Sequence, residues 1–119
     1  MATAKDAITA APHIYKVVLE NDRVRVLEVI GQPGDKTEMH SHPANVAIAI
    51  TDGKFRFTSP DGQTMEADMK AGQAMYFDAL EHAGEFTGTS EAGVIKSDGK
   101  SSRLLIAVLP VVMPFIICA

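Results

Sequence analysis

The sequence is poor in several features that would mark common classes of protein. It has a single cysteine, Cys118, among 119 residues, so no disulfide can form within the chain, which is typical of a reducing compartment. The N-terminal stretch has no cationic start followed by an apolar core, as a secretory signal would require. From these two absences we expect a cytoplasmic protein.

Clustered positive charge is also missing. The chain has 11 Lys and Arg residues against 15 Asp and Glu residues, for a net charge of −4, and a pair such as Arg23 and Arg25 is too small for a phosphate-binding surface. We therefore expect no nucleic-acid partner. The chain shows no Ser-His-Asp order, no glycine loop that could cradle a phosphate and no HExxH motif.

The composition is that of an ordinary globular domain. Hydrophobic residues make up 46% of the chain and charged residues 22%, and the length suits one domain with a core of its own. We divide the chain into a loose N-terminal lead in which a short helix can form, a barrel and an apolar C-terminal extension; the boundaries are 1–13, 14–109 and 110–119.

Short strands separated by turn residues dominate the remaining pattern. There is no long helical period and no internal repeat, while Asp52-Gly53 and Ser59-Pro60-Asp61-Gly62 are strong turn signals. About nine or ten strands at intervals of roughly 8 to 12 residues predict an all-β barrel or sandwich. The predicted strands are 14–20, 24–30, 36–42, 45–51, 54–58, 63–69, 74–77, 82–87, 94–96 and 103–109.

The C-terminal segment Leu104 to Ala119 is almost purely apolar. It is shorter than the roughly 18 to 20 residues that span a bilayer, and Pro110 and Pro114 interrupt it. We expect a core strand as far as Leu109, no membrane partner, and then an extension that must be covered, most simply in a homodimer. A tail anchor is the alternative.

Three histidines carry the clearest chemical signal. His40 and His42 follow a turn at Gly34, and in an extended strand residues two apart face the same way. His82 follows a second glycine-led strand that starts at Gly72. A single histidine is more often a surface or core residue, but this constellation within an all-β pattern indicates a shared metal site. Three neutral imidazoles suit one divalent transition metal: Fe(II), Ni, Cu(II), Co, Zn or Mn.

These motifs resemble those of a known family. Gly34-x5-His40-x-His42 resembles the first motif of the cupins, and Gly72 to His82 resembles a shortened second motif that lacks the usual proline-glycine pair. The resemblance extends from about Tyr15 to Leu109, and segments such as MHSHPANVAIAITD are similar to small single-domain cupins of the beta-alanine-degradation type. It implies a double-stranded β-helix (jelly-roll) barrel, usually dimeric, with a metal in the barrel mouth.

The chain departs from the cupin pattern at one ligand. Cupins usually supply a glutamate four or five residues after the second histidine, where this chain has Val46 and Ala47, and no carboxylate lies between His42 and Asp52. The resemblance therefore implies a three-histidine site, as in thiol dioxygenases and some diketone-cleaving cupins, or a site whose metal binding has decayed.

Further candidates follow from strand parity. Glu38 shares parity with His40 and His42, so it is a candidate fourth metal ligand or a partner of a ligand, with a solvated strand residue as the alternative. Tyr76 and Asp78 share parity with His82 and are candidate catalytic residues, as a general acid or base or as hydrogen-bond donors, although Tyr76 also suits a core.

The leading functional hypothesis is a metal-dependent enzyme of small-molecule metabolism, with dioxygenase-type oxidation favoured. The histidines would hold the metal, and apolar walls from residues such as Val46, Ile48, Phe55 and Phe57 would exclude water. The alternatives are a barrel that binds a small ligand without catalysis and a structural or regulatory dimer whose histidines are incidental.

Overall fold

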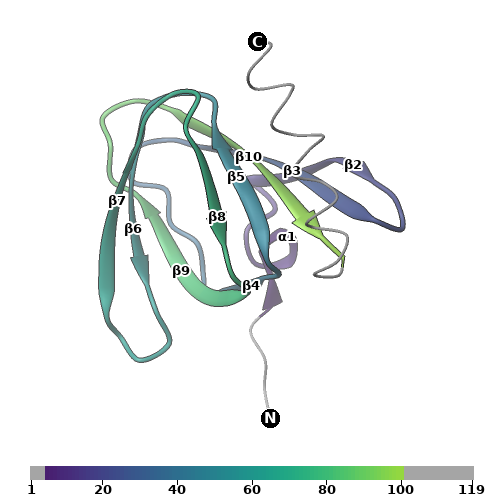
Figure 1. Cartoon of the computed structure of the whole chain (residues 1–119). Helices are drawn as coiled ribbons and strands as arrows, with labels where there is room; N and C mark the ends of the chain where they lie inside the picture. The colour runs from purple at the N-terminus through teal and green to yellow at the C-terminus, as the bar shows by residue number, and fades with distance from the viewer. Residues whose placement is uncertain (1–4, 101–119) are drawn as a thin grey trace.

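Two five-stranded sheets form the protein. The computed structural model describes residues 5–100, and in these residues ten strands and one short helix are present. The first sheet has the order β1 (Lys5–Asp6), β4 (His40–His42), β9 (Leu80–Phe86), β6 (Gly53–Thr58) and β7 (Thr64–Met69). The second has the order β2 (Tyr15–Glu20), β3 (Val24–Gly31), β10 (Ala92–Gly99), β5 (Asn45–Ala49) and β8 (Ala74–Phe77). The two sheets face each other (Figure 1), and the all-β prediction is confirmed.

In the described residues, every pair of neighbouring strands except one is antiparallel. The predicted hairpin of β2 and β3 is confirmed, and the Asn21 side chain closes its turn by accepting hydrogen bonds from the backbone N–H groups of Arg23 and Val24. The exception is β1, which lies parallel to β4. This pairing places the N-terminal strand directly beside the strand that carries two of the histidines.

The core lies between the sheets and follows the period-two pattern of the strands. In β6, Phe55 is 5% exposed while its neighbours Lys54 and Arg56 face water. The ring of Phe55 meets that of Phe86 edge to face, with centroids 5.2 Å apart. From the opposite sheet, Leu27 is fully buried. The alternation of charged and aromatic residues therefore predicts the inner face of β6 correctly.

Strand β10 is longer than predicted. The sequence predicts a fragment at 94–96 followed by a loop at 97–102, but the strand continues to Gly99. It does so because both edges of β10 are paired: Asp98 lies opposite Arg25 of β3 and opposite Asn45 of β5. Pairing on two sides outweighs the turn propensity of the Ser-Asp-Gly triplet.

From Lys5 onward, the N-terminal lead is more ordered than predicted. After β1, helix α1 (Ala7–Ala10) is capped by Asp6, whose side chain accepts a hydrogen bond of 3.0 Å from the backbone N–H of Thr9. Ala7 and Ala11 are buried at 1% and 0% exposure, so the lead forms part of the core. No helix in this described stretch, residues 5–100, is long and apolar enough to cross a membrane.

The predicted strand at 103–109 and the apolar extension at 110–119 lie outside the described residues. Within the described chain, strand β4 is shorter than the predicted strand 36–42, since residues 36–39 make only one isolated bridge, from Lys36 to Glu85.

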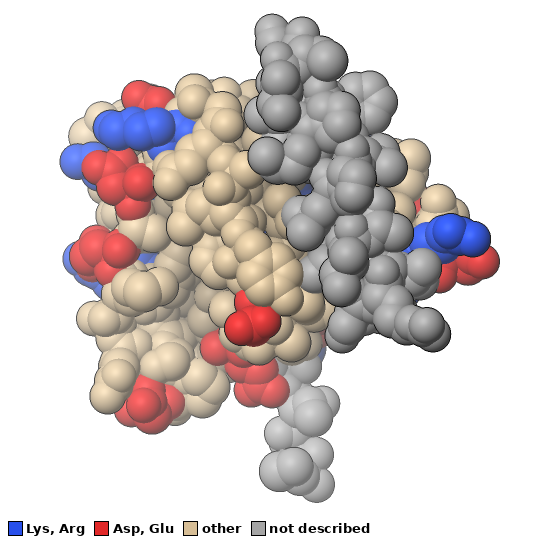
Figure 2. Space-filling view, viewed as in Figure 1, with Lys and Arg blue, Asp and Glu red and all other residues tan. Residues whose placement is uncertain are grey.

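Charges of both signs alternate on the outer surface around β6 and β7. On the face shown in Figure 2, basic and acidic side chains lie side by side at the edge that these strands form. Arg56 forms ion pairs with Glu66 and Glu85, and Lys70 with Asp68. Because the opposite charges neutralise each other locally, this edge carries no field of one sign.

Substitution of Gly31 tests the packing between the sheets. A Cβ at this position would lie 2.4 Å from the buried ring of Phe86, which already contacts Phe55 and has little room to move. We expect Gly31→Ala to lower the free energy of unfolding by about 1–3 kcal/mol, measured by urea denaturation.

Gly93→Ala is the matched control, because Gly93 lies on the neighbouring strand β10 and its added Cβ would meet nothing closer than 3.7 Å. We expect a change within about 0.5 kcal/mol for the control. Equal unfolding midpoints for the two variants would contradict the close contact.

Candidate metal centre

The pairing of β4 with β9 brings the three histidines together. His40 and His42 lie two apart on β4 and therefore face the same side, while His82 on β9 lies directly opposite His40 in the antiparallel register. His40 is fully buried, His42 is 3% exposed, and His82 is half-buried. The predicted chelating pair and the distant third histidine thus meet on one inner face of the barrel.

The imidazoles converge edge to face. The ring centroids are 4.7 Å apart for His40 and His42, 4.9 Å for His40 and His82, and 5.1 Å for His42 and His82. One nitrogen from each ring lies within 4.8 Å of the other two, and the Nε2 atoms of His40 and His42 are 3.0 Å apart. Among the described residues, these three form the group of histidine, cysteine or carboxylate side chains that could share one metal ion.

Hydrogen bonding leaves the Nε2 atoms of His40 and His82 available as ligands. Nδ1 of His40 donates a hydrogen bond of 2.7 Å to the backbone carbonyl of Glu38, which fixes the ring and leaves Nε2 with its lone pair. Nε2 of His82 is buried and has no hydrogen-bond partner within residues 5–100. A buried polar atom without a partner is costly, and a bound metal ion would satisfy it. The donor set therefore fits a divalent transition metal.

Burial keeps the three imidazoles neutral, which is the state that binds metal. Removal from water lowers the pKa of His40 and His42 below the ordinary range, and it lowers the pKa of His82 to about 3. The positive charge of Lys96 acts in the same direction on all three. Metal binding at neutral pH would therefore release no proton from these rings.

An apolar cavity of about 120 Å³ adjoins the histidines. His42 and His82 line it together with Tyr15 and Lys96, and its walls are largely aromatic, methionine and aliphatic side chains: Val29, Phe55, Phe57, Met65, Met69, Met75, Phe77, Leu80, Phe86 and Val94. The ring of Phe57 stacks on that of His82, with centroids 4.6 Å apart. A small molecule in this cavity would lie against the proposed metal ligands and out of bulk water.

The structure includes only part of the predicted wall. Phe55 and Phe57 line the cavity, but Val46 and Ile48 do not, because the residues of β5 that face inward are Asn45, Ala47 and Ala49. Ala47 is one of the two positions at which cupins usually supply a glutamate. A methyl group faces the cavity there, in agreement with a donor set of three histidines.

The structure does not bring the other predicted site residues to the histidines. Glu38 has an exposed side chain and contributes its backbone carbonyl instead. The prediction that Glu38 faces the same way as His40 and His42 assumed a strand from residue 36, whereas β4 begins at His40. Tyr76 is 52% exposed, and its hydroxyl donates a hydrogen bond of 3.0 Å to exposed Asp78. Neither residue lines the cavity, because the chain between β8 and β9 breaks the regular alternation.

Tyr15 is a site residue that the sequence analysis misses. Its hydroxyl lies 3.5 Å from Nε2 of His40, and its ring is within 6 Å of two histidine rings, at 5.6 and 5.7 Å between centroids. Burial raises the pKa of Tyr15 well above its ordinary value, so the phenol stays protonated and can donate a hydrogen bond. The hairpin register could have revealed it, since Tyr15 pairs with inward-facing Val29.

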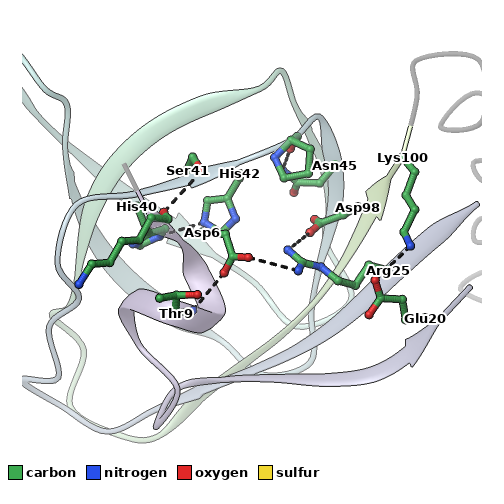
Figure 3. A network of polar contacts seen from close by, with 12 residues as sticks. Asp6, Thr9, Glu20, Arg25, His40, Ser41, His42, Asn45, Asp98 and Lys100 are labelled. Atoms are coloured by element: carbon green, nitrogen blue, oxygen red, sulfur yellow. Dashed lines mark hydrogen bonds and ion pairs between the residues drawn. The ribbon is translucent and has the colours of Figure 1, made fainter. Parts of the chain in front are cut away.

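A second polar network lies beside the histidines (Figure 3). Arg25 forms ion pairs with Asp6 and with Asp98, at 3.5 Å and 3.4 Å, so one guanidinium connects the N-terminal lead to β10. Asp98 is 2% exposed, and its Oδ1 atom has no partner within the described chain. Burial outweighs the attraction of Lys96 and Arg25 and raises the pKa of Asp98 to about 6.

Two facing sheets with histidines directed inward define a protein of the double-stranded β-helix class. A family model described as the cupin domain matches residues 27–95, which is more than half of the chain. The chain therefore belongs to the cupin family. No curated protein matches the sequence.

Solved structures agree with the fold. A cupin domain from Bordetella pertussis Tohama I is 22% identical, with a TM-score of 0.68 over 85% of this chain and 100% of that one. A conserved protein with a double-stranded β-helix domain from Klebsiella pneumoniae is 21% identical, with a TM-score of 0.60 over 75% and 77%. An RmlC-like cupin from Methanocaldococcus jannaschii is 15% identical, with a TM-score of 0.57 over 82% and 86%. These matches confirm the jelly-roll prediction, and they do not extend to the beta-alanine-degradation group.

Removal of one histidine tests the metal centre. We expect untagged protein from metal-replete growth to contain close to one equivalent of a divalent transition metal, and His42→Ala to lose most of it, measured by elemental analysis. His13→Ala is the matched control, because His13 is exposed and outside the group. Metal-free wild-type protein, or equal metal content in the two variants, would argue against the site.

Asp98 should make stability depend on pH. Its pKa is about 6 in the folded protein against an ordinary 3.8, so the folded state prefers the protonated form. The stability that this group contributes is fully present below pH 3.8 and is lost as the pH rises through 6. As the pH rises from about 4 to about 7, wild type should therefore lose up to about 3 kcal/mol of stability that Asp98→Asn does not lose.

Urea denaturation of wild type and Asp98→Asn at about pH 4 and about pH 7 checks this expectation. Groups other than Asp98 titrate in both proteins, so the difference between them isolates that carboxyl. Asp22→Asn, at an exposed position, is the control and should show no such trend. A wild-type-to-variant difference that does not change with pH would rule out the raised pKa.

Proposed function

We propose that this cupin is a metal-dependent enzyme that oxidises a small molecule with dioxygen. The observation that carries the proposal is the convergence of three neutral imidazoles, two buried and one half-buried, beside an apolar cavity. His40, His42 and His82 would hold one divalent metal, and three protein ligands leave further coordination positions open. A bound iron, copper, nickel, cobalt or manganese ion would supply Lewis acidity and one-electron chemistry.

The protein would orient the reaction through groups that are already fixed. The carbonyl of Glu38 holds the His40 ring by its Nδ1–H, and the stacked ring of Phe57 restricts His82. Because these histidine side chains are already held in place, little reorganisation would be needed when metal and substrate bind. The aromatic walls would exclude water from reactive species and strengthen electrostatic interactions inside the cavity.

Tyr15 would take the role of hydrogen-bond donor that the sequence analysis gave to Tyr76. Its neutral phenol lies 3.5 Å from Nε2 of His40 and lines the cavity. Within hydrogen-bond reach of a bound molecule, it could stabilise developing negative charge on an oxygen atom.

A second candidate function is binding of a small molecule without catalysis. The placement of Tyr76 and Asp78 on the outer surface favours it, because the predicted acid and base are then absent from the cavity. The homodimer and the cytoplasmic location stay predictions.

Oxygen uptake distinguishes the two functions. Metal-loaded protein should consume oxygen with at least one member of a panel of thiols, diketones and β-amino-acid-derived compounds. His42→Ala should abolish the uptake, while His13→Ala should leave it unchanged, because only the former removes a proposed ligand. Full metal occupancy without uptake, followed by detectable binding of a panel member, would favour the non-catalytic candidate.

A further inference from the structure

Lys96 is a buried cation in the cavity that the proposed chemistry does not use. It lies on β10 with Leu27 of β3 and Ala47 of β5 opposite, so its side chain points between the sheets. The residue is 9% exposed. Of the residues that line the cavity, Lys96 is the one Lys or Arg, and Glu85 is the one Asp or Glu.

Within residues 5–100, the ammonium group of Lys96 has no hydrogen-bond or ion-pair partner. It lies over the ring of Phe77, with Nζ 5.4 Å from the ring centroid. Asp98, the next inward-facing residue on β10, forms its ion pair with Arg25. Glu85 forms its ion pair with Arg56 on the outer side of β6. Asp98 attracts Lys96 from beyond ion-pair distance, so within the described chain the buried ammonium still has no carboxylate in contact with it. A buried charge without a paired partner is costly, and the carboxylate of a ligand could supply that partner.

The metal centre increases this need. Three neutral imidazoles with a divalent ion would carry a charge of two, and Lys96 adds one more at a cavity whose single carboxylate is already paired. Lys96 lines the same cavity as His42 and His82, so its charge and that of a bound metal would face one enclosed space. Burial lowers the pKa of Lys96 itself to about 8, which leaves it mostly protonated at neutral pH. An anion between the two positive centres would be attracted by both.

The walls limit the rest of the ligand. The cavity of about 120 Å³ is of the same order as an engineered apolar cavity of about 150 Å³ that binds benzene, so an apolar body of about one ring suits it. Apart from the charged and histidine positions, its lining is dominated by rings and methionines such as Phe57, Phe77 and Met75. The ligand should therefore combine one acid group with a small apolar body.

We propose that Lys96 determines substrate class by binding the carboxylate of a small organic acid, whose apolar body fills the cavity beside the three histidines. The inference deepens the proposed function and rests on it, because it assumes that the same cavity receives the substrate. In this arrangement Lys96 acts as a specificity residue that pairs with the acid group and takes no part in bond making.

Binding of benzoate to the full-length protein tests the role of Lys96. Isothermal titration calorimetry with benzoate and with its neutral isostere benzamide should show benzoate binding more tightly to wild type. Lys96→Met keeps the linear side chain and removes the charge, so benzoate binding should weaken roughly tenfold or more while benzamide binding stays within about twofold. Lys96→Arg should retain the preference for benzoate.

Lys100→Met is the matched control. Lys100 follows β10 and pairs with Glu20 at the surface, so its loss should leave benzoate binding unchanged. Urea denaturation of the Lys96 variants checks that they fold. Equal benzoate affinity in wild type and Lys96→Met, no preference over benzamide, or no benzoate binding to wild type at millimolar concentration would overturn the inference.

The same samples separate this inference from the proposed function. Each titration is run on chelator-treated and metal-loaded protein, with metal content measured alongside. Benzoate binding that depends on Lys96 in protein that never takes up metal would support the carboxylate site and refute the metal-dependent enzyme. Stoichiometric metal with no effect of Lys96 would refute the carboxylate site alone.

Discussion

The antiparallel register between β4 and β9 is the constraint on which the candidate site depends. It places His82 opposite His40, although the two residues are far apart in sequence, and strand alternation then adds His42 to the same face. A shift of one residue would turn His82 toward the other side of the sheet. The strand pairings of the first sheet therefore determine the composition of the histidine cluster as well as the fold, because they decide which imidazoles meet.

Burial prepares the histidines and Lys96 for ligands of opposite charge. Loss of water suppresses protonation of the histidines, which makes them better ligands for a cation. The same loss leaves the ammonium of Lys96 without solvation, which makes it a stronger site for an anion. Tyr15 stays neutral beside the histidines. One apolar enclosure would thus serve both the proposed metal and the proposed carboxylate.

Periodicity predicted the parts of the site that lie on regular strands. His40 with His42, and Phe55 with Phe57, keep the expected alternation, so these residues could be assigned to the interior from the sequence. Glu38, Tyr76 and Asp78 could not be placed in this way, because β4 starts later than predicted and the chain between β8 and β9 is irregular. Counting residues in steps of two predicts which face a side chain lies on only as long as the strand is continuous and regular.

Lys96 illustrates a different limit of sequence reasoning. In the run Val94-Ile95-Lys96-Ser97-Asp98, a pattern of apolar inside and polar outside would assign Lys96 and Asp98 to water, but both face inward. Their burial follows from the partners of β10, since Leu27 and Ala47 lie beside Lys96 on the inner face. Such non-local pairing leaves no trace in the local pattern, and functional residues often break that pattern.

The short length of β4 bears on how the site assembles. This strand has three residues, and its neighbours are β1, near the start of the described chain, and β9, some forty residues further on. Its alignment thus requires closure of two long loops, which is slow compared with the formation of a hairpin such as β2 and β3. A nascent chain would hold the first two histidines well before the third exists. The three imidazoles therefore come together only after both long loops have closed.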